Sequence, residues 1–199
     1  MEFHQFLRGR RSVRRFKPQA VPDSAIERML ATAAFAPSAH HREPWRFVVL
    51  KSPESRTWLA DAMGADLRRD LAADGLPEEE IDKQVGRSRQ RLLAAPGVIV
   101  LCMDSSEINA HPNERRATAE RMMAVQSVAA ASLQLLLAAH AEGLGGVWVC
   151  SPLFVPETVQ ESLDLPESWE PQAMFYIGYP TEIPEAGPRK PLEDTKVER

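Results

Sequence analysis

One long segment near the middle of the chain restricts the possible folds more than any other feature. From about Glu114 to Ala141 the sequence predicts a single helix, which Gly143 ends. A helix that is apolar nearly all round is buried, either against a sheet or against a partner chain. The centre of this helix consists of small and apolar residues on most faces, namely Val125, Val128, Ala129, Ala131, Ser132, Leu135 and Leu136.

Strand candidates alternate with helix candidates along the rest of the chain. The apolar segments Trp45–Lys51, Gly97–Met103, Gly145–Cys150 and Ala173–Gly178 predict four strands. This interleaving predicts an α+β or an α/β protein, although the strands are too few and the loops too irregular for a Rossmann fold. A chain of 199 residues favours one domain spanning residues 1–199.

Two further segments differ in character from this core. Residues 54–94 are charged and predict two or three helices, interrupted at Gly64 and at Asp74-Gly75-Leu76-Pro77. From Pro180 the chain is polar and rich in proline, so we expect a tail without a core of its own.

Composition excludes several classes of protein. A net charge of −4 gives no general reason to expect nucleic acid or an anionic membrane as a partner. The two cysteines, Cys102 and Cys150, form no CxxC pair, so a zinc site or a disulfide framework has little support and a reducing cytoplasm fits. We also expect no metal site, because His40 and His41 are adjacent and their side chains would diverge.

A basic segment near the N-terminus is the first candidate for a binding site. The window from Arg8 to Lys17 holds six basic residues and no acid. Arg10, Ser12 and Arg14 alternate, so in an extended strand they would point to one side, where two guanidinium groups and a hydroxyl suit a phosphate monoester. A solvated basic edge is an equally good interpretation of the charge alone, and nucleic-acid binding is a weaker one.

Other motifs argue for a cofactor that brings its own reactivity. The glycines of Gly143-Leu144-Gly145-Gly146 follow a helix and precede a strand, the reverse of a dinucleotide-binding fingerprint. Ser12, Ser38 and Ser151 have no convincing base beside them, so nucleophilic hydrolysis is weakly supported. A bound cofactor would carry the reactive group itself, so the protein would need only to position the reactants and provide the electrostatic environment.

Three motifs together resemble the FMN-dependent nitroreductase family from Phe6 to about Leu192. They are Arg10–Phe16 followed by Ala36-Pro37-Ser38, then Gly143–Cys150, and finally Arg189-Lys190-Pro191-Leu192. The resemblance implies an α+β, nitroreductase-like fold in which helices wrap a central, mostly antiparallel sheet. It also implies FMN as cofactor and an intertwined homodimer, with the long helix at the two-fold interface.

Further segments resemble one branch of this family, the carboxy-terminal FMN-binding reductase domain of the bifunctional coenzyme F-420 gamma-glutamyl ligase. Those segments are Ala36–His41, Pro44–Phe47, Arg69–Leu71, Asp74–Pro77, Leu163–Pro166 and Trp169–Pro171. That domain is held to reduce the dehydro precursor of F-420, a 5-deazaflavin. We expect this chain to be the reductase half standing alone, without the ligase domain, because Met1 stands just before the flavin motif.

The resemblance also implies roles for individual residues. Asp70 would contact the deazaflavin substrate, on a lid formed by about residues 61–93. The family more often has alanine where Ser38 stands and glycine where Cys150 stands, although a backbone N–H at position 150 would serve with any side chain. The residues expected at FMN are Arg10, Arg11, Ser12, Val13, Arg14, Ser38, Cys150 and Arg189, the last of them in the tail of about residues 180–199.

Three functions remain open from the sequence. The first is reduction of the dehydro deazaflavin precursor by a cytoplasmic, homodimeric FMN enzyme. The second is a general NAD(P)H-dependent nitro or quinone reductase that acts on another flat conjugated acceptor. The third, from another class, is a flavin- or deazaflavin-binding protein without turnover.

Overall fold

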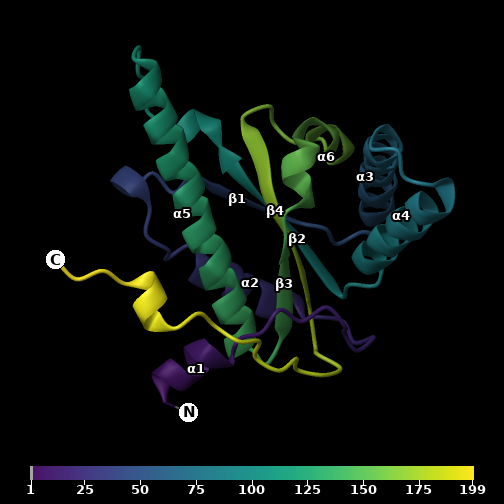
Figure 1. The fold of residues 1–199 in the computed structure, drawn as a ribbon, viewed down its shortest axis with the longest axis horizontal. Helices are drawn as coiled ribbons and strands as arrows, with labels where there is room; N and C mark the ends of the chain where they lie inside the picture. The colour runs from purple at the N-terminus through teal and green to yellow at the C-terminus, as the bar shows by residue number, and fades with distance from the viewer. Residues whose placement is uncertain (1) are drawn as a thin grey trace.

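The computed structural model describes residues 2–199 and has the α+β architecture that the sequence resemblance implied. One antiparallel sheet of four strands lies between two groups of helices (Figure 1). The helices are α1 (Phe3–Gly9), α2 (Asp23–Ala33), α3 (Pro53–Ala73), α4 (Glu78–Leu93), α5 (Glu114–Ala141) and α6 (Pro156–Ser162). The strands are β1 (Trp45–Val49), β2 (Gly97–Asp104), β3 (Gly145–Val149) and β4 (Trp169–Gly178), and short 3-10 turns include η1 (Ala39–His41) and η3 (Ser151–Phe154).

The strands lie in the order β1-β2-β4-β3, and every neighbouring pair is antiparallel. Both faces of the central strand β2 are buried along its whole length. Because successive side chains of a strand point to opposite faces, the sheet divides its apolar residues between two cores. Ile99, Leu101 and Met103 enter one core, whereas Val98, Val100 and Cys102 enter the other.

Strand β4 starts four residues earlier than the predicted Ala173. The added part of the strand contains Pro171, which has no N–H to give to a sheet ladder. The structure accommodates it opposite Cys102, where the register between β2 and β4 shifts at a bulge. The extension matters for the site, since it anchors the chain that leads out of α6.

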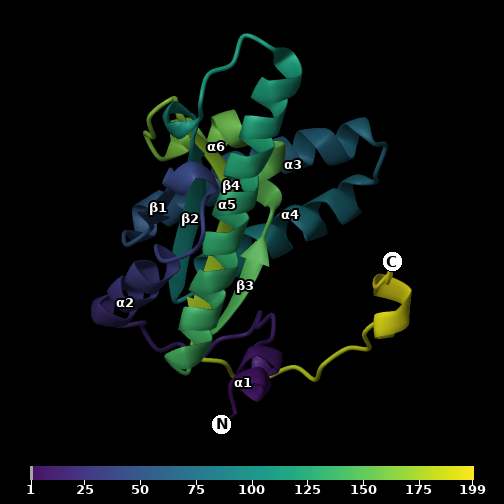
Figure 2. The ribbon, with the colours of Figure 1, turned by 90° about the vertical axis from the view of Figure 1, so that its left-hand side faces the viewer.

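Helix α5 covers one face of the sheet together with α2, as expected for a helix with an apolar centre (Figure 2). Ala131, Ser132 and Leu135 are fully buried there, whereas Met122 and Leu133 are half exposed on the outer side. By length and composition alone α5 could also cross a bilayer, and half of its apolar stretch is buried inside the protein.

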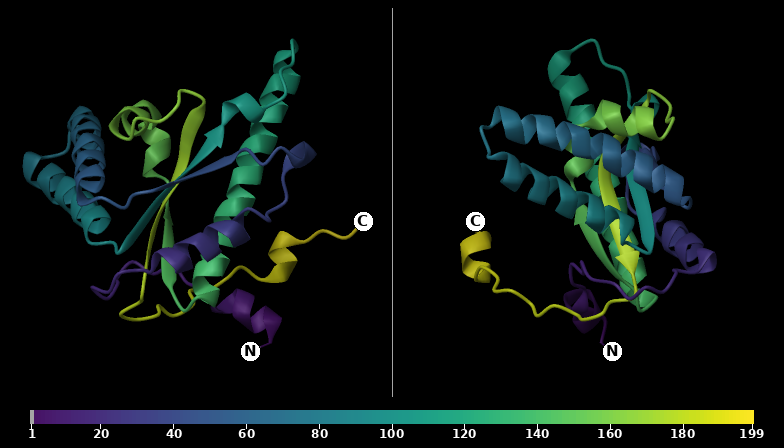
Figure 3. Two further views of the ribbon diagram at one scale, coloured as in Figure 1. Left: turned by 180° about the vertical axis from the view of Figure 1, so that it is seen from behind. Right: turned by 90° about the vertical axis from the view of Figure 1, so that its right-hand side faces the viewer.

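Helices α3, α4 and α6 cover the opposite face of the sheet, where α3 and α4 form a hairpin (Figure 3). The predicted interruption at Gly64 is wrong, because α3 continues without a break from Pro53 to Ala73. Gly64 is instead buried where the two helices meet, and a Cβ atom at this position would lie 3.4 Å from Cγ1 of Val85. The predicted break at Asp74–Pro77 is confirmed, with Gly75 at a positive φ of 79°.

The two ends of the chain meet beside β3. Ser12 pairs with Gly146 on the free edge of β3, and the Val13 N–H donates to the Gly146 carbonyl at 3.0 Å. Phe16 then pairs with Pro180, which fixes the point where the tail leaves the sheet. Beyond this point every tail residue from Thr181 onward is exposed, and the tail extends away from the body (Figure 2).

Candidate functional site

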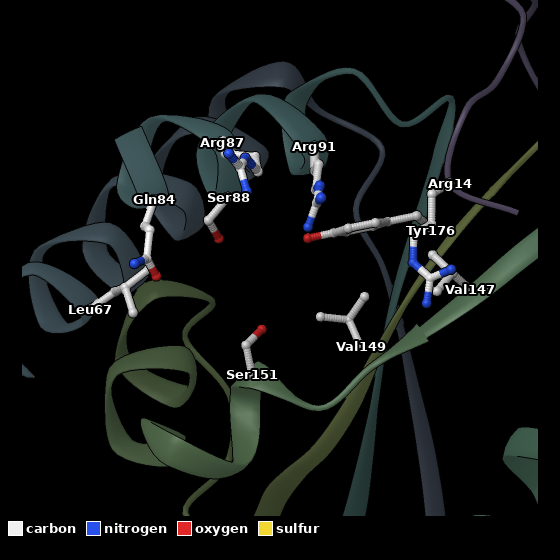
Figure 4. Close-up of a pocket in the computed structure, with 10 residues that line it drawn as sticks. All are labelled: Arg14, Leu67, Gln84, Arg87, Ser88, Arg91, Val147, Val149, Ser151 and Tyr176. Atoms are coloured by element: carbon white, nitrogen blue, oxygen red, sulfur yellow. The ribbon is translucent and has the colours of Figure 1, made fainter. Parts of the chain in front are cut away.

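A cavity of about 230 Å³, the arginine cavity, lies between α4 and the end of β3. Three arginines line it, Arg14 from the N-terminal segment and Arg87 and Arg91 from α4. Figure 4 shows Arg87 and Arg91 on α4, Arg14 beside Val147 beyond the Tyr176 ring, and Ser88 and Ser151 at the side nearer η3. The remaining wall is apolar or neutral and consists of Leu67, Gln84, Val147, Val149 and Tyr176.

Successive side chains of β3 point to opposite faces of the sheet, which explains why its two valines line the cavity. Val147 and Val149 belong to the core on the α3–α4 side of the sheet, whereas Trp148 between them packs on the α5 side. Tyr176 reaches the same side from the neighbouring strand β4 and directs its hydroxyl toward Arg91 (Figure 4). Burial raises the pKa of Tyr176 to about 12, and the charge of Arg91 opposes this shift, so the hydroxyl is neutral at physiological pH.

The arginines of this cavity differ from their neighbours in having no acidic partner. Among residues 2–199, none of Arg14, Arg87 and Arg91 lies within 4.0 Å of a carboxylate oxygen, and no acid lines the cavity. Other arginines of the same hairpin are neutralised: Arg68 by Glu78 and Asp82, Arg69 by Asp66 at 2.6 Å, and Arg89 by Asp61 at 2.7 Å. The structure thus separates basic groups that the sequence could not tell apart.

A second cavity of about 390 Å³, the apolar cavity, continues from the first between α3 and η3. The two cavities share Leu67, Ser88 and Ser151 in their linings, so they lie directly beside each other. Asp70 and Cys150, which the sequence assigned to substrate and flavin respectively, both line the apolar cavity. The other members of its lining are mostly apolar, namely Met63, Leu71, Phe154 and Val155, with Asp74 as a second acid.

The N-terminal candidates do not all face the same space. Arg10, Arg11 and Val13 line a separate cavity of about 120 Å³ beside Gly143–Gly146, whereas Arg14 lines the arginine cavity. Val13 is buried, and the Arg11 guanidinium donates to the Arg10 carbonyl at 2.8 Å. The meeting of Arg10 and Arg14 on one phosphate therefore stays a prediction. Only isolated β-bridges hold the N-terminal segment. It therefore lacks the continuous strand on which the predicted alternation of Arg10, Ser12 and Arg14 depended.

Ser38 and Arg189 lie away from both cavities within one chain. The Ser38 hydroxyl accepts from the Glu43 N–H at 3.1 Å, in a loop that contacts α5 through a bond from the Ala39 N–H to Ser127. Arg189 is exposed in the tail and donates to the carbonyls of Gly187 and Pro188. Neither residue lines the arginine cavity or the apolar cavity.

The sequence offered Arg87 and Arg91 only together with Arg68, Arg69 and Arg89, as candidates for holding a phosphorylated acceptor side chain, and it assigned only Arg14 of this cavity to FMN. Arg87 and Arg91 stood among many charges of a helical hairpin, and their spacing of one helical turn was the only signal that they share a face. Val147, Val149 and Tyr176 carried no signal at all, because a strand residue gives no sign of whether it faces a core or a cavity.

Together these groups suit a flat, amphipathic ligand that carries negative charge. Guanidinium groups bind phosphate and carbonyl oxygens, the serine hydroxyls donate hydrogen bonds, and the valines offer an apolar surface to a ring. The donor set therefore fits FMN, which combines a planar ring system with a phosphate. Among residues 2–199, no group of three His, Cys, Asp or Glu residues is arranged to hold a metal ion.

Comparison with known proteins identifies one family. The profile of the "Nitroreductase family" matches residues 7–179. The Bacillus subtilis protein YfhC, which is named as an NAD(P)H nitroreductase, is 30% identical over 192 residues, covering 96% of this chain and 91% of that protein. A 5,6-dimethylbenzimidazole synthase of Rhodospirillum rubrum is 34% identical over 180 residues, covering 88% and 82% of the two chains.

A solved structure shares the fold over its whole length. A nitroreductase-type protein from Desulfovibrio desulfuricans, determined in complex with FMN, superimposes with a TM-score of 0.75 at 24% identity. The match covers 100% of this chain and 97% of the other.

Proposed function

The chain belongs to the nitroreductase family, and from that premise we propose that it reduces the dehydro precursor of the 5-deazaflavin coenzyme F-420. The protein is an FMN-dependent oxidoreductase. The proposed reaction adds two electrons and two protons across the enolpyruvyl-derived double bond in the side chain of the precursor. NAD(P)H is the proposed source of the electrons, and solvent can supply a proton.

One observation carries this proposal: Asp70 and Cys150 line the same cavity, although they lie 80 positions apart in the sequence. The close resemblance of this chain to the F-420 branch includes the segment Arg69-Asp70-Leu71. FMN binding alone does not require that segment, so its presence beside the cofactor cavity supports a role in binding the acceptor. The apolar lining suits a flat conjugated ring.

The residues of the arginine cavity would hold FMN. Bound FMN supplies the two-electron redox chemistry of the reaction. Arg14 and Arg91 would donate hydrogen bonds to its oxygens and offset its negative charge, while Val147 and Val149 would form a wall against its ring. Burial of this wall excludes water from one side of the cofactor, which strengthens the electrostatic contacts made there.

We further propose that the functional unit is a homodimer. Ser38 and Arg189 are family-motif residues that lie away from the arginine cavity in one chain, so the partner subunit would have to bring them to FMN. Arg10, Arg11, Ser12 and Val13 would approach the ribityl phosphate from the edge of β3. The α3–α4 hairpin, about residues 61–93, would act as a lid over the acceptor. Two free thiols, Cys102 and Cys150, support a cytoplasmic location.

The proposal is tested on FMN-loaded protein reduced with dithionite under anaerobic conditions. Incubation with the dehydro precursor should give a product heavier by two hydrogen atoms, measured by mass spectrometry. Nitroaromatic compounds should be reduced more slowly per active site. Reduced protein that leaves the precursor unchanged would disprove the proposed acceptor.

A general NAD(P)H-dependent nitro or quinone reductase is the second candidate. The similarity to YfhC over 96% of the chain favours it, and the mostly apolar lining of the second cavity would suit other flat acceptors as well. Rapid turnover of nitrofurans or quinones, with no reaction of the precursor, would establish this second function. A non-catalytic flavin-binding protein would be reoxidised by neither class of acceptor.

A further inference from the structure

A wide groove opens from the arginine cavity toward solvent, on the side away from η3. This outer groove has a volume of about 630 Å³ and shares Arg14, Arg87 and Arg91 with the arginine cavity. Arg15, Phe16 and Gln90 extend it beyond that cavity. A ligand bound at the inner valines could therefore reach past the three arginines without leaving the protein surface.

The groove concentrates positive charge that nothing in its lining offsets. Four guanidinium groups line it and no carboxylate does. Only Arg15 has an acidic partner, Glu182 at 3.3 Å, and both side chains of that pair are largely exposed, so the ion pair is weak. Clustered like charges repel each other and destabilise the folded chain. Four acids of the hairpin, Asp61, Asp66, Glu78 and Asp82, are instead paired with arginines outside the groove.

We infer that the outer groove binds a phosphoryl group carried by a substrate that enters the cleft beside FMN. This inference rests on the proposed function, since it assumes that the arginine cavity holds the cofactor. Planar guanidinium forks bind the oxygens of phosphate in pairs, and several forks around one groove suit a phosphodiester or a pyrophosphate. Two substrates carry such a group: the phosphorylated side chain of a deazaflavin acceptor and the pyrophosphate of a nicotinamide dinucleotide donor.

Two substitutions at Gln90 test this inference. Gln90→Glu adds a negative charge to the groove and Gln90→Lys adds a positive charge, so they should change phosphate binding in opposite directions. Gln90 is exposed on α4 and lines the groove but not the arginine cavity, so both variants should fold and retain FMN. The probes are 5-deazariboflavin and its 5′-phosphate, titrated into FMN-loaded protein with fluorescence detection. These probes differ only in the phosphate, so the ratio of their dissociation constants isolates its contribution.

Gln90→Glu should weaken binding of the phosphate-bearing probe about two- to fivefold relative to the phosphate-free probe, the size of one exposed charge interaction. Gln90→Lys should strengthen it by a similar factor. Both effects should shrink as ionic strength rises. Gln5→Glu makes the same change of charge on α1, outside the groove, and serves as the control, which should leave the ratio unchanged.

A second arm identifies which substrate supplies the phosphoryl group. Stopped-flow reduction of the bound FMN by NADH gives an apparent dissociation constant for the donor in each Gln90 variant. A shift in that constant without a shift in the probe ratio assigns the groove to the donor pyrophosphate, and the reverse assigns it to the acceptor. If neither quantity moves, or if Gln90→Glu purifies without FMN, the inference is overturned.

Failure of the proposed function would look different from failure of this inference. Suppose that wild-type protein leaves the dehydro precursor unreduced, but the probe ratio or the dissociation constant of the donor still follows the charge at position 90. The proposed acceptor is then wrong, and the phosphoryl-binding groove is supported. If the protein reduces the precursor and neither quantity depends on the charge at position 90, the proposed acceptor is supported and the phosphoryl-binding groove is refuted.

Discussion

Cys102 and Cys150 show how far the surroundings of a single residue decide its chemistry. Cys102 lies inside β2 with no exposed surface, and burial raises the pKa of its thiol to about 12, which leaves it protonated and unreactive. Cys150 directly follows β3, is exposed and lines the same apolar cavity as Asp70. The sequence showed two cysteines in similar apolar segments, whereas only Cys150 is open to a substrate.

The first prediction at this scale concerns Arg10 and Arg14. Replacing both with alanine should weaken FMN binding roughly a hundredfold or more, because each charged hydrogen bond contributes about 1.5–3 kcal/mol. The double variant should purify without colour, and its affinity for FMN can be measured by fluorescence quenching. The control is the double variant Arg8→Ala with Lys17→Ala, which removes the same charge from the same segment. An equal loss of FMN affinity in both double variants would mean that only the total charge of the segment matters.

The second prediction concerns Asp70, which is exposed on α3 at the apolar cavity. Asp70→Ala should leave the affinity for FMN unchanged and weaken binding of the deazaflavin, both measured by titration. Asp61→Ala, on the same helix but outside both cavities, should change neither affinity, because its exposed ion pair with Arg89 contributes little. Loss of both affinities in Asp70→Ala, or of neither, would contradict the separate roles of the two cavities.

At the scale of elements, the contact between the N-terminal segment and β3 determines where Arg14 points. This contact depends on Gly145, where a Cβ atom would lie 2.6 Å from Cγ2 of Val13 and 2.7 Å from its Cβ. Val13 is buried and β-branched, so it has no alternative position to move to. The glycine thus permits the close approach that the bond from the Val13 N–H to the Gly146 carbonyl requires.

Gly145→Ala should therefore lower the free energy of unfolding by about 1–3 kcal/mol. It should also weaken FMN binding, since the segment that carries Arg14 would be displaced. Adding Val13→Ala should recover part of both losses by removing the clashing methyl groups. Stability is measured by chemical denaturation and FMN affinity by titration.

Gly86→Ala is the matched control for this variant. Gly86 lies inside α4 with nothing within 4 Å of the added Cβ, so alanine there should raise stability by about 0.5–1 kcal/mol. A Gly145→Ala protein that is as stable as wild type would show that the segment is not held by this contact.

At the scale of the whole molecule, the chain leaves apolar surface that one subunit does not cover. Ile183, Leu192 and Val197 are between 65% and 80% exposed in a tail that has no core of its own. Met122 and Leu133 are half exposed on the outer side of α5. A second subunit would cover both surfaces and supply Ser38 and Arg189, in agreement with the proposed dimer.

Truncation after Glu182 tests this arrangement. It keeps the bridge from Phe16 to Pro180 and the ion pair from Arg15 to Glu182, so the folded core should remain intact. The truncated protein should show a weaker dimer by analytical ultracentrifugation and a lower affinity for FMN. A monomer that retains FMN at the wild-type affinity would contradict the proposed assembly.

The sequence by itself determined the elements, because their signals are local. The predicted helix from about Glu114 to Ala141 follows from a long run of small and apolar residues that Gly143 ends, and the structure has this helix with the same limits. Family motifs also singled out Asp70 for the substrate and Cys150 for the flavin, and both residues line one cavity. Gly64 misled the prediction from sequence, because this glycine serves a close contact between two helices and does not interrupt one.

Only the tertiary structure decided which charges face the site. Arg68, Arg69, Arg87, Arg89 and Arg91 look alike in the sequence, yet Asp61, Asp66, Glu78 and Asp82 neutralise three of them and leave Arg87 and Arg91 in the cleft. The pairing depends on how α3 packs against α4 and how their hairpin lies over β3. Because electrostatic interaction falls off over a few ångströms, a function that depends on unpaired charge is set by distances in space, which a linear sequence does not contain.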